Sequence, residues 1–238
     1  MNLTCIDIGN TNIVIGSYKD GNLKTSIRIQ TDSRQINKKI NFENLGYVAI
    51  SSVVPEIEEI MKNKINLPCF TVSHTNSNVI LDVDSPSEVG NDRICNMKVA
   101  IKNKLYPSII VDFGSATTYD VINNKGNFIG GAIAPGIDVS AKNLFKKAAQ
   151  LDTVNFKVPK YVIGKNTVTN LQSGIMYGGI DSINGMIRRI KEEVDYDINH
   201  IILTGGFSSL LSKKITTPHT VEPDLTLQGI KYIWEENQ

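Results

Sequence analysis

The 238-residue sequence predicts an α/β fold made of two duplicated domains, each a mixed β-sheet with flanking helices. The first observation is an apolar, β-branched run that ends in an aspartate, at Asp7 and again at Asp112, and that small or polar residues and a second strand follow. The second is spacing: Gly21 follows Asp7 by 14 positions (21 − 7), and Gly126 follows Asp112 by the same 14 (126 − 112). Two copies in register indicate a duplication, with the element order βββαβαβα in each half.

The first half of the chain predicts one such domain. After the Ile13–Tyr18 strand of the hairpin, the expected elements are a strand (Thr25–Gln30), a helix or loop (Thr31–Leu45), a strand (Tyr47–Val54), a helix (Glu56–Lys64), a short strand (Phe70–Ser73), a polar loop (Asn76–Ser87) and a helix (Glu88–Leu105). Pro55 supports the first of these helices because proline is favoured at the first helical position. Pro107 marks the boundary, so we expect domains over residues 1–106 and 107–238.

The second half predicts the same order in a longer form. The expected elements are three strands within Ser108–Ala134, a helix (about Val139–Ala149), a short strand (Tyr161–Ile163), a long helix (Val168–Val194), a strand (His200–Leu203) and a closing helix (Pro223–Glu236). Thr167 can cap the long helix. Several glycines in that helix suggest close packing against another helix or a ligand.

Composition excludes several classes of protein. With 41% hydrophobic residues the chain can bury a substantial core, and its net charge of +1 gives no reason to expect nucleic acid or a membrane surface as a partner. We expect neither a membrane-spanning helix nor a secretory signal, because no long apolar run and no basic segment before an apolar block are present. Three widely spaced cysteines without a metal-binding pattern predict reduced thiols in a cytoplasmic protein.

The two aspartate-ended hairpins carry the chemistry. Small residues after each aspartate let the backbone approach a ligand closely, and hydroxyl groups can donate hydrogen bonds. An aspartate beside such a turn suits an anionic, metal-bound phosphate. Either loop alone could be an ordinary β-hairpin, but two in register favour two phosphate-facing hairpins across a cleft.

Eight short motifs of this kind follow one another along nearly the whole chain. They are DIGNTNIVIG (7–16), SSVVP (51–55), PSEVGNDR (86–93), DFGSATTYD (112–120), GGAIAPG (130–136), GKNTVTNLQSGI (164–175), LTGGF (203–207) and PDLTLQGI (223–230). Together they resemble the motifs of type III pantothenate kinase, within the actin, hexokinase and Hsp70 superfamily of ATP-using folds. The resemblance implies two domains of the actin-like ATPase (ribonuclease H-like) type.

The resemblance also implies a reaction, the transfer of the γ-phosphoryl group of ATP to pantothenate, which is the first step of coenzyme A biosynthesis. Asp7 would hold Mg²⁺ on the ATP phosphates, and Asp112 would hold a monovalent cation, K⁺ or NH₄⁺. The implied ATP-binding residues are Asp7, Ile8, Gly9, Asn10, Thr11, Asn12, Ile13, Val14, Ser115, Gly205 and Gly206. Ser115 stands where the family usually has threonine, and it keeps the hydroxyl group.

Asp92 is the implied general base, because it matches the aspartate of the family's Gly-x-Asp-Arg motif and a carboxylate can accept the proton of the substrate hydroxyl. Without the resemblance, a helix-capping role for Asp92 would be the simpler interpretation. The implied substrate-binding residues are Val83, Gly90, Asn91, Asp92, Arg93 and Thr167. Val83 departs from the family, which usually has tyrosine there, so part of the pantothenate pocket is expected to differ.

Two alternatives remain at this stage. The same fold could phosphorylate another small hydroxylated metabolite, since fold alone does not fix the substrate. The chain could also be a non-catalytic regulatory relative, because some family members are described as accessory transcription factors. The presence of Asp7, Asp92 and Asp112 speaks against the second alternative. The resemblance further implies a homodimer with pockets near the subunit interface.

Overall fold

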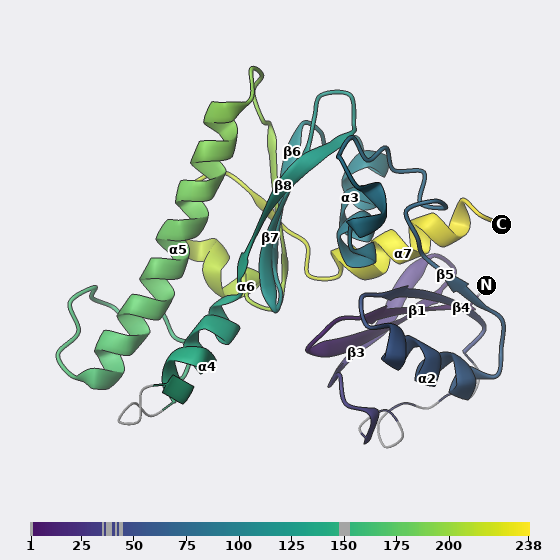
Figure 1. Ribbon diagram of the computed structural model, residues 1–238, viewed down its shortest axis with the longest axis horizontal. Helices are drawn as coiled ribbons and strands as arrows, with labels where there is room; N and C mark the ends of the chain where they lie inside the picture. The colour runs from purple at the N-terminus through teal and green to yellow at the C-terminus, as the bar shows by residue number, and fades with distance from the viewer. Residues whose placement is uncertain (1, 35, 37–39, 41, 43–44, 148–152) are drawn as a thin grey trace. The chain divides into compact units, whose positions relative to one another are not determined.

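The computed structural model describes the chain except for residue 1, residue 35, and residues 37–39, 41, 43–44 and 148–152. It forms two five-stranded sheets with flanking helices (Figure 1). The chain divides into two compact units. Unit 1 comprises Met1–Tyr106, Lys125–Gly130 and Asp224–Gln238, and unit 2 comprises Pro107–Asn124 and Gly131–Pro223.

The sheet of unit 1 has the order β3-β2-β1-β4-β5. Its strands are β1 (Asn2–Ile8), β2 (Asn12–Lys19), β3 (Asn22–Gln30), β4 (Tyr47–Ser52) and β5 (Cys69–Thr71). Strands β1, β2 and β3 pair antiparallel, whereas β4 is parallel to both β1 and β5. Because β1 lies at the centre, its aspartate-bearing end is flanked by the β1–β2 turn on one side and the end of β4 on the other.

Among the described residues of unit 1, the longer helices are α2 (Pro55–Ile65), α3 (Asn91–Lys102) and α7 (Leu225–Glu235). Helix α2 covers one sheet face, where Ile6 and Ile50 pack with Met61 in an apolar core. Helices α3 and α7 pack against each other and against strands of the same sheet (Figure 1). Their contact is close because Gly229 of α7 lies directly on the backbone of Cys95 in α3.

The second sheet repeats the topology of the first, with the order β10-β9-β6-β7-β8. Its strands are β6 (Ser108–Phe113), β7 (Ala116–Ile122), β8 (Phe128–Pro135), β9 (His200–Gly205) and β10 (Thr220–Val221). The register repeats as well: Asp7 of β1 pairs with Ser51 of parallel β4, and Asp112 of β6 pairs with Thr204 of parallel β9. These repeats confirm the duplicated α/β fold.

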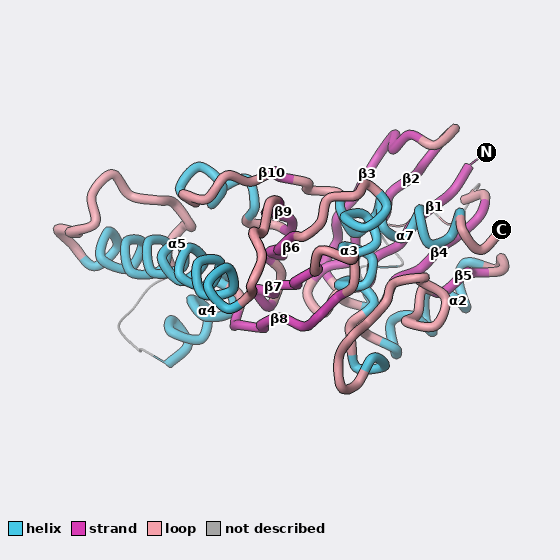
Figure 2. The backbone as a smooth tube through the Cα atoms, turned by 90° about the horizontal axis from the view of Figure 1, so that it is seen from above, coloured by secondary structure: helices cyan, strands magenta, loops and turns pink. Residues whose placement is uncertain are grey.

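The helices of unit 2 are α4 (Ile137–Lys147), α5 (Thr167–Glu193) and the short α6 (Ser208–Leu211). The apolar face of α5, including Ile180 and Ile187, packs on sheet residues such as Val111 and Tyr119. Helix α4 lies beside α5 in both views (Figures 1 and 2). The close packing predicted for the glycine-bearing helix is found at Gly179, where an added Cβ would lie 2.9 Å from Ile137 of α4. It is not found at Gly174, Gly178 or Gly185, where an added Cβ would have no neighbouring atom within 4 Å.

The structure corrects three sequence predictions. The helix expected from Glu88 begins at Asn91, because Pro86–Glu88 forms a separate 3₁₀ turn and Val89 is extended. The strand expected at Tyr161–Ile163 does not form, and these side chains are exposed; the fifth strand is β10 instead. The cap of α5 is Asn166 rather than Thr167.

Other predicted elements differ from the structure in their bounds or in the unit to which they belong. Helix α4 begins at Ile137, before the expected Val139, and the expected end near Ala149 falls outside the described residues, as does part of Thr31–Leu45. The closing helix α7 was expected in the second domain, but it packs on α3 and so belongs to unit 1. Among the described residues, no helix combines the length and apolar character needed to cross a membrane.

Candidate active site

A braced loop joins β1 to β2 in unit 1. The Gly9 amide donates to the Asn12 carbonyl at 3.0 Å. Thr31, just after β3, donates its amide to the Thr11 carbonyl at 2.9 Å and its hydroxyl to the Gly9 carbonyl at 2.7 Å. Asn10 and Thr11 are exposed between these anchors. The loop therefore combines a fixed backbone with an exposed polar rim, an arrangement suited to a phosphate chain.

Three of the residues predicted to contact ATP in this stretch are apolar. Ile8 and Ile13 are fully buried in the core beneath α2, and Val14 is half-buried. The Ile8 carbonyl accepts the Val53 amide at 3.0 Å, which ties the end of β1 to the residue after β4. The side chains of Ile8 and Ile13 therefore form the base of the loop, so that only their backbone groups could face a nucleotide.

Asp7 lies at the end of β1, directly before the braced loop. Its side chain is half-buried, and its Oδ1 accepts a hydrogen bond of 3.2 Å from the Ser51 hydroxyl of β4. Ser51 itself is fully buried. A carboxylate held at one oxygen in this way has a restricted orientation.

Helix α3 begins with the Gly-x-Asp-Arg motif. The Asn91 side chain donates to the Ser52 carbonyl at 3.1 Å, which attaches the helix start to the end of β4. The Asp92 Oδ1 accepts the Arg93 amide at 2.8 Å, and an added Cβ at Gly90 would lie 2.6 Å from that oxygen. Burial raises the pKa of the Asp92 carboxyl, although Arg93 opposes the shift. Asp92 is thus a half-buried carboxyl with a raised pKa in the first turn of a helix.

Arg93 lies over an aromatic ring that sequence analysis did not identify. Its guanidinium carbon is 5.4 Å from the centroid of Phe128, a buried residue at the start of β8 and part of unit 1. The backbone of Phe128 is bound on both sides, donating to the Ile80 carbonyl at 2.9 Å and accepting the Asp82 amide at 2.8 Å. Phe128 therefore supports both Arg93 and the segment that leads to half-buried Val83.

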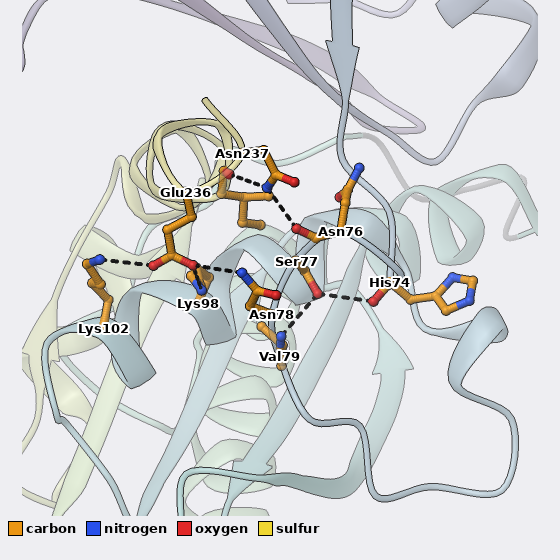
Figure 3. Close-up of polar contacts among 10 residues, drawn as sticks. His74, Asn76, Ser77, Asn78, Val79, Lys98, Lys102, Glu236 and Asn237 are labelled. Carbon is orange, nitrogen blue, oxygen red and sulfur yellow. Dashed lines mark hydrogen bonds and ion pairs between the residues drawn. The ribbon is translucent and has the colours of Figure 1, made fainter.

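The far end of α3 is anchored by the C-terminal segment (Figure 3). Glu236 accepts bonds from Lys98 at 2.5 Å, Lys102 at 2.9 Å and Asn78 at 3.3 Å. Partial burial opposes ionisation of Glu236, but these three donors outweigh it and lower the pKa of its carboxyl to about 2. One carboxylate thus joins α7, α3 and the loop before the Val83 segment.

Unit 2 has a related arrangement at the end of β6. The Asp112 side chain is half-buried and lies against Gly205 of β9, where any Cβ would overlap with its Oδ1. Gly205 has a φ of +84°, a left-handed conformation that favours glycine. The Gly206 amide donates to the Phe113 carbonyl at 3.0 Å, and the Ser208 hydroxyl donates to the Gly205 carbonyl at 2.7 Å. The two glycines form a tight turn beside the carboxylate.

The loop that contains Ser115 is braced from β8. The Gly136 amide donates to the Ser115 carbonyl at 3.1 Å, and the Gly114 amide donates to the Ala116 carbonyl at 3.0 Å. A Cβ at Gly136 would lie 2.5 Å from the Gly114 carbonyl oxygen, so this contact requires glycine. Gly136 comes directly after β8, and Thr31 comes directly after β3. Each of them donates a hydrogen bond to the loop that follows the aspartate-ended strand of its own unit.

Thr167 is the first residue of α5 and is exposed. The capping of α5 uses its neighbours instead: Asn166 Oδ1 accepts the Thr169 amide at 2.9 Å, and Thr169 Oγ1 accepts the Asn166 amide at 3.2 Å. The Thr167 hydroxyl is therefore not needed for the cap.

The side chains around Asp7 suit a metal ion that binds together with a nucleotide. Within the described ranges, no group of three or more histidine, cysteine, aspartate or glutamate residues could hold a metal ion. Magnesium bound to ATP keeps water and phosphate oxygens as ligands and needs only one or two carboxylates. Asp7, beside the braced loop, can supply such a carboxylate.

Solved structures share the fold at low sequence identity. A protein from Campylobacter jejuni described as a Baf family transcriptional activator has a TM-score of 0.67 at 22% identity, with 98% of each chain covered. The protein Lmo2764 from Listeria monocytogenes, described as an N-acetylmannosamine kinase, has a TM-score of 0.55 at 12% identity, with both chains fully covered. The ethanolamine utilization protein EutJ from Carboxydothermus hydrogenoformans has a TM-score of 0.55 at 14% identity, over 97% of this chain and 89% of that one. These likenesses concern the fold alone.

The family assignment rests on sequence. The model of the type III pantothenate kinase family matches residues 3–189, which is more than half of the chain. The match includes the loop after Asp7, the Gly-x-Asp-Arg motif, the Asp112 hairpin and the start of α5. The chain therefore belongs to the type III pantothenate kinase family of ATP-using phosphotransferases.

Proposed function

We propose that this protein transfers the γ-phosphoryl group of ATP to the primary hydroxyl of pantothenate and so forms 4′-phosphopantothenate, the first intermediate on the way to coenzyme A. The observation that carries the proposal is the start of α3. There Gly90 leaves space for the Asp92 carboxylate, burial raises the pKa of that carboxyl, and Arg93 follows directly. An adjacent base and cation suit a substrate that has both a hydroxyl and a carboxylate.

Asp92 would act as the general base. Phosphoryl transfer requires mainly positioning and charge stabilisation, and the protein must also accept the proton of the attacking hydroxyl. A carboxylate of raised pKa is the stronger base, provided that it is ionised at the working pH. The hydrogen bond from the Arg93 amide to Asp92 Oδ1 would orient the carboxylate that accepts that proton.

The nucleotide phosphates would bind at the loop that follows Asp7. The exposed Asn10 and Thr11, together with Asn12, would offer donors to phosphate oxygens, and Gly9 would shape the loop through the hydrogen bond from its amide to the Asn12 carbonyl. Magnesium bound with ATP would neutralise part of the phosphate charge, and Asp7 would hold it directly or through water. In unit 2, Ser115, Gly205 and Gly206 would contact ATP, and Asp112 would bind potassium or ammonium.

Arg93 would bind the anionic or polar part of pantothenate, because its planar cation pairs well with carboxylates. Its position over Phe128 restricts its motion. Asn91, Val83 and Thr167 would complete the substrate contacts. Valine is smaller than the tyrosine usual in the family, which would widen the pocket at this point.

The functional molecule would be a homodimer assembled through unit 2. Several large apolar side chains of this unit are exposed, among them Ile133 (65%), Tyr161 (66%) and Ile163 (76%). A cavity of about 460 Å³ lies between α4 and α5, with Leu144 and Ile175 in its lining. Exposed apolar surface of this kind is typical of protein–protein contact.

ATP-dependent synthesis of a cofactor precursor also suits the cytoplasm, as do the three free cysteines.

A coupled assay tests the proposal. Purified protein with ATP, Mg²⁺ and K⁺ should release ADP only when pantothenate is added. N-acetylmannosamine and other small hydroxylated compounds at the same concentration serve as alternative acceptors. Faster ADP release with one of these would make the protein a kinase for another metabolite, and the absence of release with every acceptor would support a non-catalytic role.

A further inference from the structure

Ser51 occupies a special place in the sheet of unit 1. It pairs with Asp7 across the parallel strands β4 and β1, and its hydroxyl is 3.2 Å from Asp7 Oδ1. Its neighbour Ile50 points into the core beneath α2, so Ser51 points to the opposite sheet face, on which Cys95 of α3 is found. A fully buried serine in this position serves the carboxylate rather than the apolar core.

The third participant is Cys95. It is fully buried in α3, three residues after Asp92, and therefore about one helical turn further along the same helix. Burial raises the pKa of the Cys95 thiol, and the negative charge of Asp7 raises it further. The thiol thus remains protonated, and it adds no negative charge beside Asp7.

These contacts determine the direction of the Ser51 proton. A serine hydroxyl has one proton to donate and two lone pairs to accept with. The Ser51 hydroxyl donates that proton to Asp7 Oδ1 at 3.2 Å. Ser51 therefore ties the Asp7 carboxylate on β1 to the neighbouring strand β4.

The duplicated half has the same pairing. Asp112 pairs with Thr204 on the parallel strands β6 and β9, and Thr204 is also buried, with 1% exposure. A buried hydroxyl residue thus stands opposite the strand-end aspartate in both halves. The recurrence indicates that the position serves the aspartate and tolerates either serine or threonine.

We propose that Ser51 is a positioning residue that fixes the orientation of the Asp7 carboxylate for the magnesium ion of the bound nucleotide. It holds Oδ1, so the carboxylate does not rotate and Oδ2 keeps one direction. This role rests on the proposed function, because it assumes that Asp7 meets magnesium bound to nucleotide. Ser51 itself touches neither substrate nor metal.

Isothermal titration calorimetry of ADP with the purified full-length chain, in Mg²⁺ and in EDTA, tests this role. In the wild type, Mg²⁺ should strengthen ADP binding. In Ser51→Ala, that magnesium-dependent gain should fall by roughly 10- to 100-fold, the usual effect of removing a group that orients a metal ligand. ADP affinity in EDTA should stay at the wild-type value.

Two further variants separate positioning from a general structural effect. Thr4→Val removes a buried hydroxyl of β1, which donates to the Leu45 carbonyl at 2.7 Å, and this change should leave the magnesium-dependent gain intact. Ser51→Thr should restore the gain, since Thr204 occupies the corresponding position in the second half. If threonine lowers thermal stability, Ser51→Cys, a weaker donor, should give an intermediate gain.

The results that would contradict the role of Ser51 can be distinguished from those that would contradict the proposed function. A wild-type magnesium-dependent gain in Ser51→Ala overturns the role of Ser51 and leaves the proposed function standing. An equal loss of affinity in Mg²⁺ and in EDTA also overturns it, because the residue would then be merely structural. A wild-type protein that binds no ADP in either condition overturns both this role and the proposed function.

Discussion

Gly90 and Asp92 are sterically coupled at the start of α3: a Cβ at position 90 would lie 2.6 Å from Asp92 Oδ1. The glycine of the Gly-x-Asp-Arg motif is thus explained by space and not by backbone conformation, since its φ of −57° is open to any residue. A methyl group at this position must displace the carboxylate or the helix start.

Gly90→Ala should therefore reduce turnover while the fold is kept. Displacement of a reacting group by about 1 Å can lower a rate by roughly 10²-fold. Steady-state kinetics with pantothenate and circular dichroism give the two readouts. Gly185→Ala is the matched control, because that glycine lies inside α5 with open space around it and the change should stabilise the helix by about 1 kcal/mol. Full turnover in Gly90→Ala would show that the carboxylate position is not critical.

Asp92→Asn should increase stability at neutral pH. Burial raises the pKa of Asp92 above its ordinary value of 3.8, so between that value and the folded-state pKa the folded protein binds more protons than the unfolded one. Stability conferred by the neutral form is therefore lost as pH rises through this window. Denaturant melts of both proteins should agree below the window and favour Asp92→Asn above it. A variant less stable than the wild type at pH 7 would contradict the sign of the shift.

Glu236→Gln should destabilise unit 1 at neutral pH by about 1 to 3 kcal/mol, the range for hydrogen bonds to charged groups. The folded pKa of Glu236 is about 2, below its ordinary value of 4.5, so its stabilisation is present above 4.5 and lost as pH falls toward 2. Urea melts at pH 7 and at about pH 3 should show that the stability difference between the wild type and Glu236→Gln becomes smaller in acid.

Glu235→Gln is the control. It removes a pair with Lys231 one turn away on the same helix and should lower stability by no more than about 0.5 kcal/mol. Equal losses in both variants would rule out a special role for Glu236.

Activity should depend on potassium or ammonium held at Asp112. Replacing K⁺ by Na⁺ or Li⁺ at constant ionic strength should depress the rate sharply, because the smaller ions fit a site of fixed oxygens less well. In Asp112→Asn the rate should be low in all three salts. Equal wild-type rates in the three salts would show that activity does not depend on a specific monovalent cation.

The features that could be predicted from sequence are those with strong local signals. The strand ends at Asp7 and Asp112 follow from β-branched runs and turn glycines, and α2 follows from Pro55. Tyr161–Ile163 has the composition of a strand yet is exposed, since no neighbouring strand pairs with it. The strand β10 has only two residues, too few to produce a periodic pattern.

Contacts between segments far apart in the chain were not predictable. Phe128 reaches Arg93 because the tip of the second hairpin belongs to unit 1, which no local pattern reveals. Ser51 was visible as part of a motif, but its contact with Asp7 depends on the register of β1 and β4. Likewise, α7 returns to unit 1 because its apolar face, with Ile230 and Trp234, packs against α3 and β1.

Product analysis of Asp92→Asn beside the wild type tests the central claim most directly. Each protein is incubated with ATP, Mg²⁺, K⁺ and pantothenate, and the phosphorylated product and ADP are quantified by ³¹P NMR. The wild type should form 4′-phosphopantothenate and ADP in equal amounts, and Asp92→Asn should form them roughly 10² to 10⁴ times more slowly with nucleotide binding unchanged. Wild-type protein that forms no phosphorylated pantothenate, or an Asp92→Asn variant that keeps most of the rate, would contradict the account.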